Sequence, residues 1–144
     1  MNKTAFITGA GGYIGAQTAV TFAKEGINVA VCDISEYAVK ATVDKLSSAG
    51  GNAKGYVCDV TALNDIENAV NTAADDFGSL DIMVHIAGGS ARIAGGKYVP
   101  LAEQKEEVID RVIKVNLYGA LWADKAAAKV MIKQARGGKI INFA

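Results

Sequence analysis

A glycine-rich turn at residues 8–15 is the first stretch of this sequence whose residue types and spacing suggest chemistry. It reads Thr-Gly-Ala-Gly-Gly-Tyr-Ile-Gly and follows the apolar run Ala5–Ile7. Glycine has no Cβ and tolerates positive φ, so backbone amides of such a turn can approach a phosphate, which the next helix N-terminus favours electrostatically. We expect a dinucleotide pyrophosphate there. The predicted binding residues are Gly9, Gly11, Gly12, Tyr13, Ile14 and Gly15.

Taken alone, this turn has other interpretations. Glycine also serves ordinary tight turns, and methyltransferases use a similar turn for a different nucleotide-like ligand. The context favours the dinucleotide, because the turn lies between a strand-like and a helix-like segment.

Acidic residues follow the next two apolar runs. Asp33, with Ile34 beside it, comes where a carboxylate can accept hydrogen bonds from the ribose hydroxyls of adenosine. It would repel a 2′-phosphate, and no arginine or lysine follows directly, so we expect NAD in preference to NADP. Asp59 and Val60 are expected to hold an adenine edge. Plainer interpretations remain: a cap or loop acid for Asp33, and a turn for Asp59.

Short β-rich runs alternate with segments of helical period, which indicates βαβ units. The expected strands are Ala5–Ile7, Val29–Cys32, Lys54–Cys58, Ile82–Ile86 and Lys139–Phe143. The expected helices run from Tyr13 to Glu25, from Ser35 as N-cap to Gly50, from Thr61 as N-cap to Phe77, and, broken or bent, from Leu101 to Gln134. Because parallel crossovers are right-handed, we predict a doubly wound, Rossmann-type parallel sheet of order 3-2-1-4-5 in an α/β/α sandwich.

Composition bounds the other possibilities. The 144 residues fit one domain, and a hydrophobic share of 51% argues against disorder. Fifteen basic and fifteen acidic side chains cancel, which gives no nucleic-acid or membrane-surface signal. No apolar run is long enough for a membrane span, and no signal peptide is visible. Cys32 and Cys58 lack metal-ligand spacing, so we expect no metal and two reduced thiols in a cytoplasmic protein.

Six motifs in order make the chain resemble the short-chain dehydrogenase/reductase family over nearly its whole length. They are Thr8-Gly9 to Gly15, Asp33, Asp59-Val60, Ala87-Gly88, Val115-Asn116-Leu117-x-Gly119 and Gly137-Gly138-Lys139-Ile140-Ile141-Asn142. The resemblance implies a Rossmann fold, a nicotinamide cofactor that also contacts Ala87 and Gly88, and hydride exchange between an alcohol and a carbonyl. It implies a catalytic role for Asn116, whose counterpart bends its helix and holds a water in a proton relay. A polar residue bonded to its own helix is the plainer interpretation.

The sequence departs from the family pattern in three places. Tyr13 stands where the simplest branch has glycine, and the glycine spacing is closer to that of sugar-nucleotide epimerases and dehydratases. His85-Ile86 replaces the usual Asn-Asn, and we expect His85 to be bonded to backbone rather than to act as a base. The family's catalytic serine would follow Ala144, and the 144 residues hold no Tyr-x-x-x-Lys pair, so this chain alone is expected to be inactive.

The favoured hypothesis is the NAD-binding portion, residues 1–144, of an oxidoreductase acting on a small alcohol or carbonyl substrate. The alternatives are a non-catalytic nucleotide-binding or interaction module and a relative of the epimerases and dehydratases. The sheet would be incomplete at its C-terminal edge, where the last strand and the long helix would lie uncovered. Exposed edges and apolar faces favour pairing with another chain, so we expect a homo-oligomer.

Overall fold

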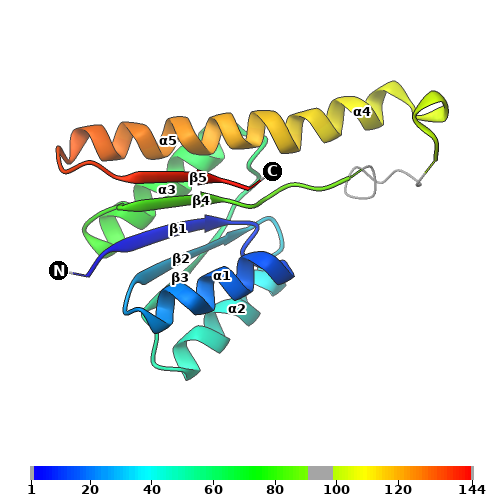
Figure 1. The fold of residues 1–144 in the computed structure, drawn as a ribbon. Helices are drawn as coiled ribbons and strands as arrows, with labels where there is room; N and C mark the ends of the chain where they lie inside the picture. Colours follow the sequence, from blue (N-terminus) through cyan, green and yellow to red (C-terminus); the bar gives the residue numbers. More distant parts are fainter. Residues whose placement is uncertain (1, 91–98, 144) are drawn as a thin grey trace.

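The computed structural model describes residues 2–90 and 99–143, which fold around one parallel sheet of five strands (Figure 1). The strands are β1 (Thr4–Thr8), β2 (Asn28–Asp33), β3 (Ala53–Val57), β4 (Ile82–His85) and β5 (Lys139–Asn142). The α-helices are α1 (Tyr13–Lys24), α2 (Glu36–Ser48), α3 (Leu63–Phe77), α4 (Glu106–Ile113) and α5 (Gly119–Lys133). Neighbouring strands pair in the order β3-β2-β1-β4-β5, which confirms the predicted topology.

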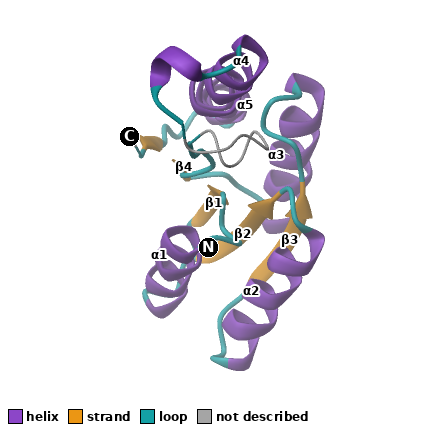
Figure 2. Cartoon of the chain, turned by 90° about the vertical axis from the view of Figure 1, so that its right-hand side faces the viewer, coloured by secondary structure: helices purple, strands orange, loops and turns teal. Residues whose placement is uncertain are grey.

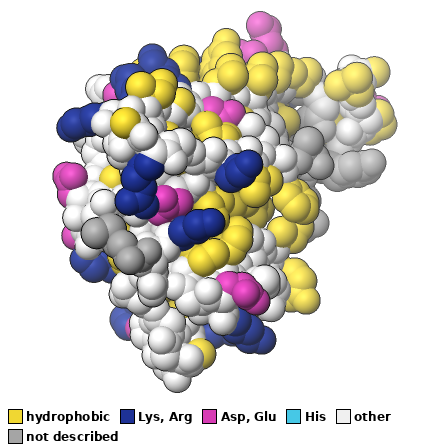
Figure 3. Space-filling view, turned by 60° about the vertical axis from the view of Figure 1, so that its left-hand side comes forward, with side chains coloured by type: hydrophobic (Ala, Val, Ile, Leu, Met, Phe, Trp, Pro, Cys, Tyr) yellow, Lys and Arg dark blue, Asp and Glu magenta, His cyan; other side chains and the backbone are white. Residues whose placement is uncertain are grey.

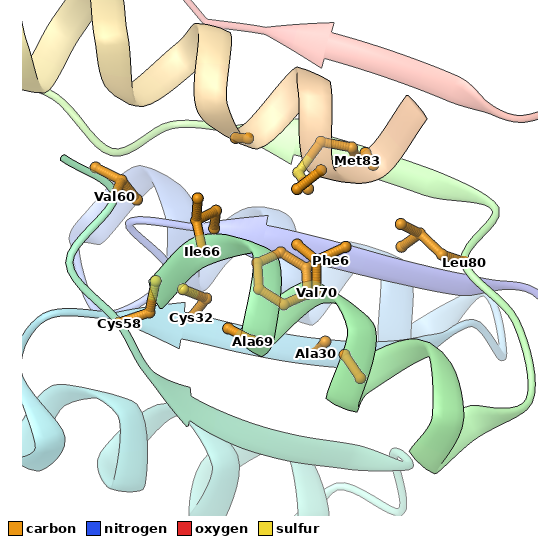
Figure 4. Close-up of a cluster of buried hydrophobic side chains, with 14 of the residues drawn as sticks. Phe6, Ala30, Cys32, Cys58, Val60, Ile66, Ala69, Val70, Leu80 and Met83 are labelled. Atoms are coloured by element: carbon orange, nitrogen blue, oxygen red, sulfur yellow. The ribbon is translucent and has the colours of Figure 1, made fainter. Parts of the chain in front are cut away.

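Helices cover both faces of the sheet, with α1 and α2 on one side and α3 and α5 on the other (Figures 1 and 2). Side chains alternate along a strand, so β1 turns Ala5 and Ile7 toward α1 and α2 and turns Phe6 toward α3 and α5. On the α3 side, Phe6 packs with Ile66 and Val70 in a fully buried cluster (Figure 4). The three-layer α/β/α arrangement is therefore as expected.

The N-termini of α2 and α3 test the capping predictions. Ser35 caps α2 as expected, because its hydroxyl accepts a hydrogen bond from the amide of Ala38 over 3.3 Å. Thr61 was wrongly predicted as the cap of α3. Ala62 occupies the N-cap position, and the Thr61 hydroxyl instead donates to the Asp59 carboxylate over 2.7 Å. The Thr61 amide and hydroxyl are both bonded to Asp59, which keeps Thr61 in the turn one residue before the N-cap.

The long helical segment is broken twice. A 3₁₀ turn at Leu101–Glu103 is separated from α4 by Gln104 and Lys105, which have extended backbone angles. A π-helical turn at Lys114–Tyr118 then joins α4 to α5. Its centre is Asn116, whose side-chain amide donates to the Val112 carbonyl over 2.8 Å. A break or bend was therefore correctly expected, although the segment is not one continuous helix.

The β5 edge and the helices beside it carry apolar side chains to the surface (Figure 3). All four residues of β5 are exposed. The large exposed apolar residues of α4, the π turn, α5 and β5 are Ile109, Ile113, Leu117, Tyr118, Leu121, Ile132, Ile140 and Ile141. None of the helices in the described part of the chain is long and apolar enough to cross a membrane.

Candidate functional site

A cleft of about 850 Å³ lies at the carboxyl ends of the strands, where α4 faces the turn between β1 and α1. Parallel strands deliver their C-terminal residues to one edge, and the order reverses between β1 and β4, which is where such sheets bind ligands. Eleven of the residues predicted from the sequence line this cleft. They are Gly9, Gly12, Tyr13, Ile14, Gly15, Asp33, Ile34, Asp59, Val60, Ala87 and Gly88.

The glycine turn needs glycine for two different reasons. Gly9 has a φ of 65°, and a Cβ there would come within 2.7 Å of the Ala87 amide nitrogen. A Cβ on Gly15 would overlap the Gly9 carbonyl oxygen, so the start of α1 can only approach the turn without a side chain. Gly12 caps α1 with no side-chain acceptor, and the first-turn amides of a helix have no intrahelical partner. These amides are available to an anion in the cleft.

Asp33 and Gly11 are joined directly. The Gly11 amide donates to Asp33 Oδ2 over 3.0 Å, and the Ser35 amide donates to Oδ1 over 3.1 Å. Two backbone donors therefore orient the carboxylate that lines the cleft. Gly11 itself is not among the lining residues, so its place is behind the turn, holding Asp33, rather than against a ligand.

Asp59 forms the turn that was its plainer interpretation. Its Oδ1 accepts from the amide of Thr61 over 2.9 Å and from the Thr61 hydroxyl over 2.7 Å, while its amide donates to Asp65 Oδ2 over 2.8 Å. The turn presents Asp59, Val60 and Thr61 to the cleft. The same residues therefore form a hydrogen-bonded turn and line the cleft.

The end of β4 is held by the Thr8 hydroxyl. Its oxygen accepts from the amides of Ile86 and Ala87 over 3.1 and 3.2 Å and lies 2.9 Å from His85 Nδ1. The ring nitrogen Nδ1 pairs with a side chain of the adjacent strand, and the Ala87 backbone also acts on the ring, so the expected backbone interaction is accompanied by one that was not expected. Burial lowers the pKa of His85, against the opposing effects of the Asp124 carboxylate and the Ala87 backbone.

Asn116 is not among the residues that line the cleft, but it is bonded to the segment that follows β4. Its side-chain nitrogen donates to the Gly89 carbonyl over 2.8 Å and its side-chain oxygen accepts from the Gly89 amide over 3.0 Å. A Cβ on Gly88 would come within 2.6 Å of that oxygen. The π turn is therefore tied to the strand-like segment after β4, and the bond to Val112 shows the helix-bonded arrangement that was the plainer interpretation.

Sequence reasoning missed the contribution of α4 and of three other lining residues, Cys58, Thr61 and Ile86. Glu107, Asp110, Arg111 and Lys114, followed by Val115, line the cleft from the far side. Positions 107, 110, 111 and 114 follow the i, i+3, i+4, i+7 spacing of one helix face, a signal that was present in the sequence. Two cations and two carboxylates thus face the ligand space.

Cys58 lies under the cleft beside Cys32, and both thiols are free and buried (Figure 4). The hydrogen bond with Cys58, together with burial, raises the pKa of Cys32, so this thiol stays protonated. Within residues 2–90 and 99–143, no group of three or more histidine, cysteine, aspartate or glutamate side chains is placed to hold a metal ion.

The residues present fit a nicotinamide adenine dinucleotide. Glycine at positions 9 and 15 lets the turn pack against Ala87 and the start of α1 pack against the turn, and the amides at the start of α1 suit a pyrophosphate. The oriented carboxylate of Asp33 suits a ribose diol. Val60, together with Ile34 and Ile86, adds an apolar lining suited to a flat ring system.

Comparison with known proteins identifies the family. The profile of the short chain dehydrogenase family matches residues 3–144, and the chain belongs to that family. Diacetyl reductase [(S)-acetoin forming] of Staphylococcus epidermidis is 37% identical over 142 residues, covering 99% of this chain and 53% of the reductase. Galactitol 2-dehydrogenase of Agrobacterium fabrum is 38% identical over 143 residues, covering 99% and 52% of the two chains.

Solved structures agree with the fold. A short-chain type dehydrogenase/reductase from Mycobacterium marinum superposes with a TM-score of 0.90 at 30% identity, covering 97% of this chain and 54% of that one. NAD⁺-bound xylitol dehydrogenase gives a TM-score of 0.89 at 33% identity, covering 97% and 52%. The chain spans about half the length of the relatives it matches.

Proposed function

We propose that the cleft binds NAD and that the chain serves an NAD-dependent oxidoreductase of the short-chain dehydrogenase/reductase type. When bound, the nicotinamide supplies hydride exchange between an alcohol and a carbonyl. The observation that carries the proposal is the convergence of the glycine turn, Asp33 and the Asp59-Val60 pair on one cleft. Relatives named as a diacetyl reductase and a galactitol 2-dehydrogenase support a small alcohol or carbonyl as substrate.

Each part of the cofactor has residues suited to it. The amides at the start of α1, in Tyr13, Ile14 and Gly15, would take the pyrophosphate, with Gly9 and Gly12 leaving room for it. Asp33 would accept hydrogen bonds from the adenosine ribose, with Ile34 beside it. The Asp59-Val60 turn would border the adenine, and Ala87 and Gly88 would wall the remaining side of the cleft. These assignments follow the order in which the strand ends line the edge of the sheet.

The preference for NAD over NADP rests on Asp33. Its carboxylate is oriented by the Gly11 and Ser35 amides, so it cannot turn away from a 2′-phosphate without losing two hydrogen bonds. Arg111 of α4 and Lys114, the first residue of the π turn, line the same cleft. The preference for NAD therefore requires the repulsion of a 2′-phosphate by Asp33 to exceed its attraction by Arg111 and Lys114. A direct comparison of NAD and NADP affinities measures this balance.

Asn116 is proposed to support catalysis in the whole enzyme by positioning. Its two bonds to Gly89 hold the segment after β4 against the π turn, which shapes the wall beside Ala87 and Gly88. The 144 residues contain no Tyr-x-x-x-Lys pair to activate a proton donor. We accordingly propose that this polypeptide, tested alone, binds the cofactor and turns over no substrate.

Isothermal titration of the 144-residue chain with NAD, NADP and a uridine-diphosphate sugar tests the proposal. We expect NAD to bind most tightly, NADP more weakly, and the sugar nucleotide not at all. Tightest binding of the sugar nucleotide would favour a relative of the epimerases and dehydratases, and no binding of any of the three would contradict the proposal. NADH absorbance in the presence of NAD and secondary alcohols should stay flat, since measurable turnover would refute the proposed inactivity.

Two further properties belong to the proposal. The free, buried thiols Cys32 and Cys58 support a reducing compartment, and we propose the cytoplasm. The exposed apolar residues of α5 and β5 support self-association of the chain.

A further inference from the structure

The Thr8 hydroxyl oxygen lies within hydrogen-bond distance of three nitrogen atoms. Two of them are the amides of Ile86 and Ala87, which can only donate. A hydroxyl oxygen has two lone pairs and one proton. The two amides therefore occupy both lone pairs, and the Thr8 proton is left for the third neighbour, His85 Nδ1, at 2.9 Å.

This count of donors assigns the tautomer of His85. Nδ1 must accept the Thr8 proton, so in the neutral ring the proton of the imidazole is on Nε2. Thr8 is fully buried and His85 is 2% exposed, so solvent does not supply an alternative donor or acceptor to either group. A proton added to the ring can only go to Nδ1, where it would face the Thr8 oxygen, and the Ala87 backbone as well as the Asp124 carboxylate favours this charged form.

The Nε2 side of the His85 ring is part of a polar cluster that includes Asp124 and Asn142. His85 Nε2 and Asp124 Oδ1 are buried polar atoms with no hydrogen-bond partner among the described residues. The second Asp124 oxygen, Oδ2, accepts from Asn142 Nδ2 over 2.8 Å. A Cβ on Gly119 would come within 3.5 Å of His85 Cε1, so α5 packs closely on the ring. Thr8 from β1, Gly119 from α5 and Asn142 from β5 carry no charge, and Asp124 of α5 is the charged group that acts on His85.

We propose that His85 is a positioning residue of the cofactor cleft, which holds the wall at Ile86 and Ala87 through Thr8 only while its ring is neutral. Protonation at Nδ1 would leave three N–H donors competing for two lone pairs of the Thr8 oxygen. One bond to the Ile86 or Ala87 amide is then lost, and both residues line the cleft. Acidification therefore loosens the wall and weakens cofactor binding, a consequence that rests on the proposed function.

The tautomer can be observed directly, because the chain contains a single histidine. In protein purified without a histidine tag, imidazole ¹⁵N spectra separate the protonated from the unprotonated ring nitrogen. We expect the neutral ring to carry its proton on Nε2. We also expect the amide resonances of Ile86 and Ala87 to shift with the same midpoint as the ring. The inference would be overturned by a neutral ring with its proton on Nδ1, or by Ile86 and Ala87 amide resonances that do not shift as the ring titrates. Either result holds whether or not the chain binds NAD.

Cofactor affinity supplies the second measurement. NAD is titrated from about pH 8 to about pH 5, the range in which histidine changes charge. If only the neutral form binds, affinity falls by at most about tenfold per pH unit below the His85 midpoint. Asp124→Asn removes the carboxylate that favours the charged ring, so the fall should move to lower pH. Asp44→Asn, the same change at an exposed site on α2, should leave it in place.

The outcomes separate the two proposals. NAD binding that weakens with the ring titration and moves with Asp124→Asn supports the positioning role. NAD binding that stays constant while His85 titrates overturns it and leaves the proposed function standing. No NAD binding at about pH 8, where the ring is neutral, contradicts the proposed function, and the two amide resonances then still decide whether His85 holds the wall.

Discussion

The Gly11 amide donates a hydrogen bond to the Asp33 carboxylate over 3.0 Å, which ties the turn after β1 to the end of β2. A Cβ on Gly11 would come within 2.5 Å of the Ala38 Cβ and 2.9 Å of the same carboxylate oxygen, so this close approach of the turn to α2 and Asp33 requires glycine. One glycine of the turn proposed to bind the pyrophosphate therefore also orients the carboxylate proposed to face the ribose. The turn and the acidic residue are one structural unit rather than two independent motifs.

Replacing Asp33 with asparagine should reduce discrimination between the cofactors. The neutral amide no longer repels a 2′-phosphate and makes weaker hydrogen bonds to the ribose, because bonds to charged groups are the stronger ones. We expect the ratio of NAD to NADP affinity to fall about tenfold, or about 1.4 kcal/mol, measured by isothermal titration. Asp44→Asn serves as the matched control on the exposed face of α2. An unchanged ratio of NAD to NADP affinity would show that Asp33 does not contact the adenosine ribose.

Gly9→Ala and Gly26→Ala form a matched pair at positive φ. Gly9 has a φ of 65°, and a Cβ added there would lie 2.7 Å from the Ala87 nitrogen, whereas Gly26 has a φ of 73° and its added Cβ would meet nothing within 4 Å. Left-handed backbone alone costs about 1–2 kcal/mol, and overpacking adds about 1–3 kcal/mol. Urea unfolding should therefore show the larger loss for Gly9→Ala, which should also abolish NAD binding. Equal losses would mean that the crowding at Gly9 is relieved by movement.

Thr8→Val should destabilise the chain far more than Thr8→Ser. Valine keeps the shape but leaves the amides of Ile86 and Ala87 without their acceptor, at about 1–3 kcal/mol for each unsatisfied buried group. Serine keeps the hydroxyl and loses one methyl group, which costs about 0.5–1.5 kcal/mol. Chemical denaturation of both variants at one pH measures the difference. Similar losses of unfolding free energy in the two variants would show that Thr8 stabilises the chain by packing rather than by its hydrogen bonds.

Asp81 should stabilise the fold fully above its ordinary pKa and progressively less as the pH falls toward its lowered pKa. Burial works to raise the pKa of Asp81, but hydrogen bonds from Arg136, Thr4 and Ser79 outweigh it and lower the pKa. A carboxyl whose pKa is lowered by folding contributes stability above the unfolded value of 3.8, and this is lost as pH falls through the folded value. Asp81→Asn should cost about 1–3 kcal/mol at neutral pH, and the gap to wild type should close in acid. A gap independent of pH would contradict this.

The exposed β5 edge should make the 144-residue chain self-associate. Ile141 is 46% exposed on that strand, and a lysine there places a charge on the edge, which disfavours strand pairing. Light scattering after gel filtration should show an assembly for the wild type and a smaller species for Ile141→Lys. Tyr37→Lys, at an exposed apolar site on α2, is the control and should behave as wild type. A monomeric wild type would end this prediction.

The sheet and most of the cleft could be predicted because their signals are local. Apolar runs closed by glycine mark strands and helices, and the right-handed crossover rule then orders the strands. Asp33, Asp59 and Ala87 follow three different strands, so the parallel arrangement alone brings them to one edge. The same reasoning would have found the α4 face, had its charged residues been read at helical spacing.

The partners of single polar groups could not be predicted from local sequence. His85 and Thr8 are 77 residues apart, and their contact depends on the register between β1 and β4. Thr61 is a plausible cap by residue type, but the neighbouring Asp59 carboxylate takes its hydroxyl. The break before α4 likewise has no strong breaker, since Gln104 and Lys105 are ordinary helix formers. Tertiary context overrides propensity at these positions.

The π turn sets the rotational phase between α4 and α5. A π turn accommodates one more residue than an α-helical path, and each residue advances a helix by about 100°. Deleting one residue from Lys114–Tyr118 would therefore rotate the whole of α4 about its axis while the alanine-rich face of α5 stayed against the sheet. Arg111 would swing out of the cleft, so the one additional residue of the π turn determines which side chains of α4 line the cleft.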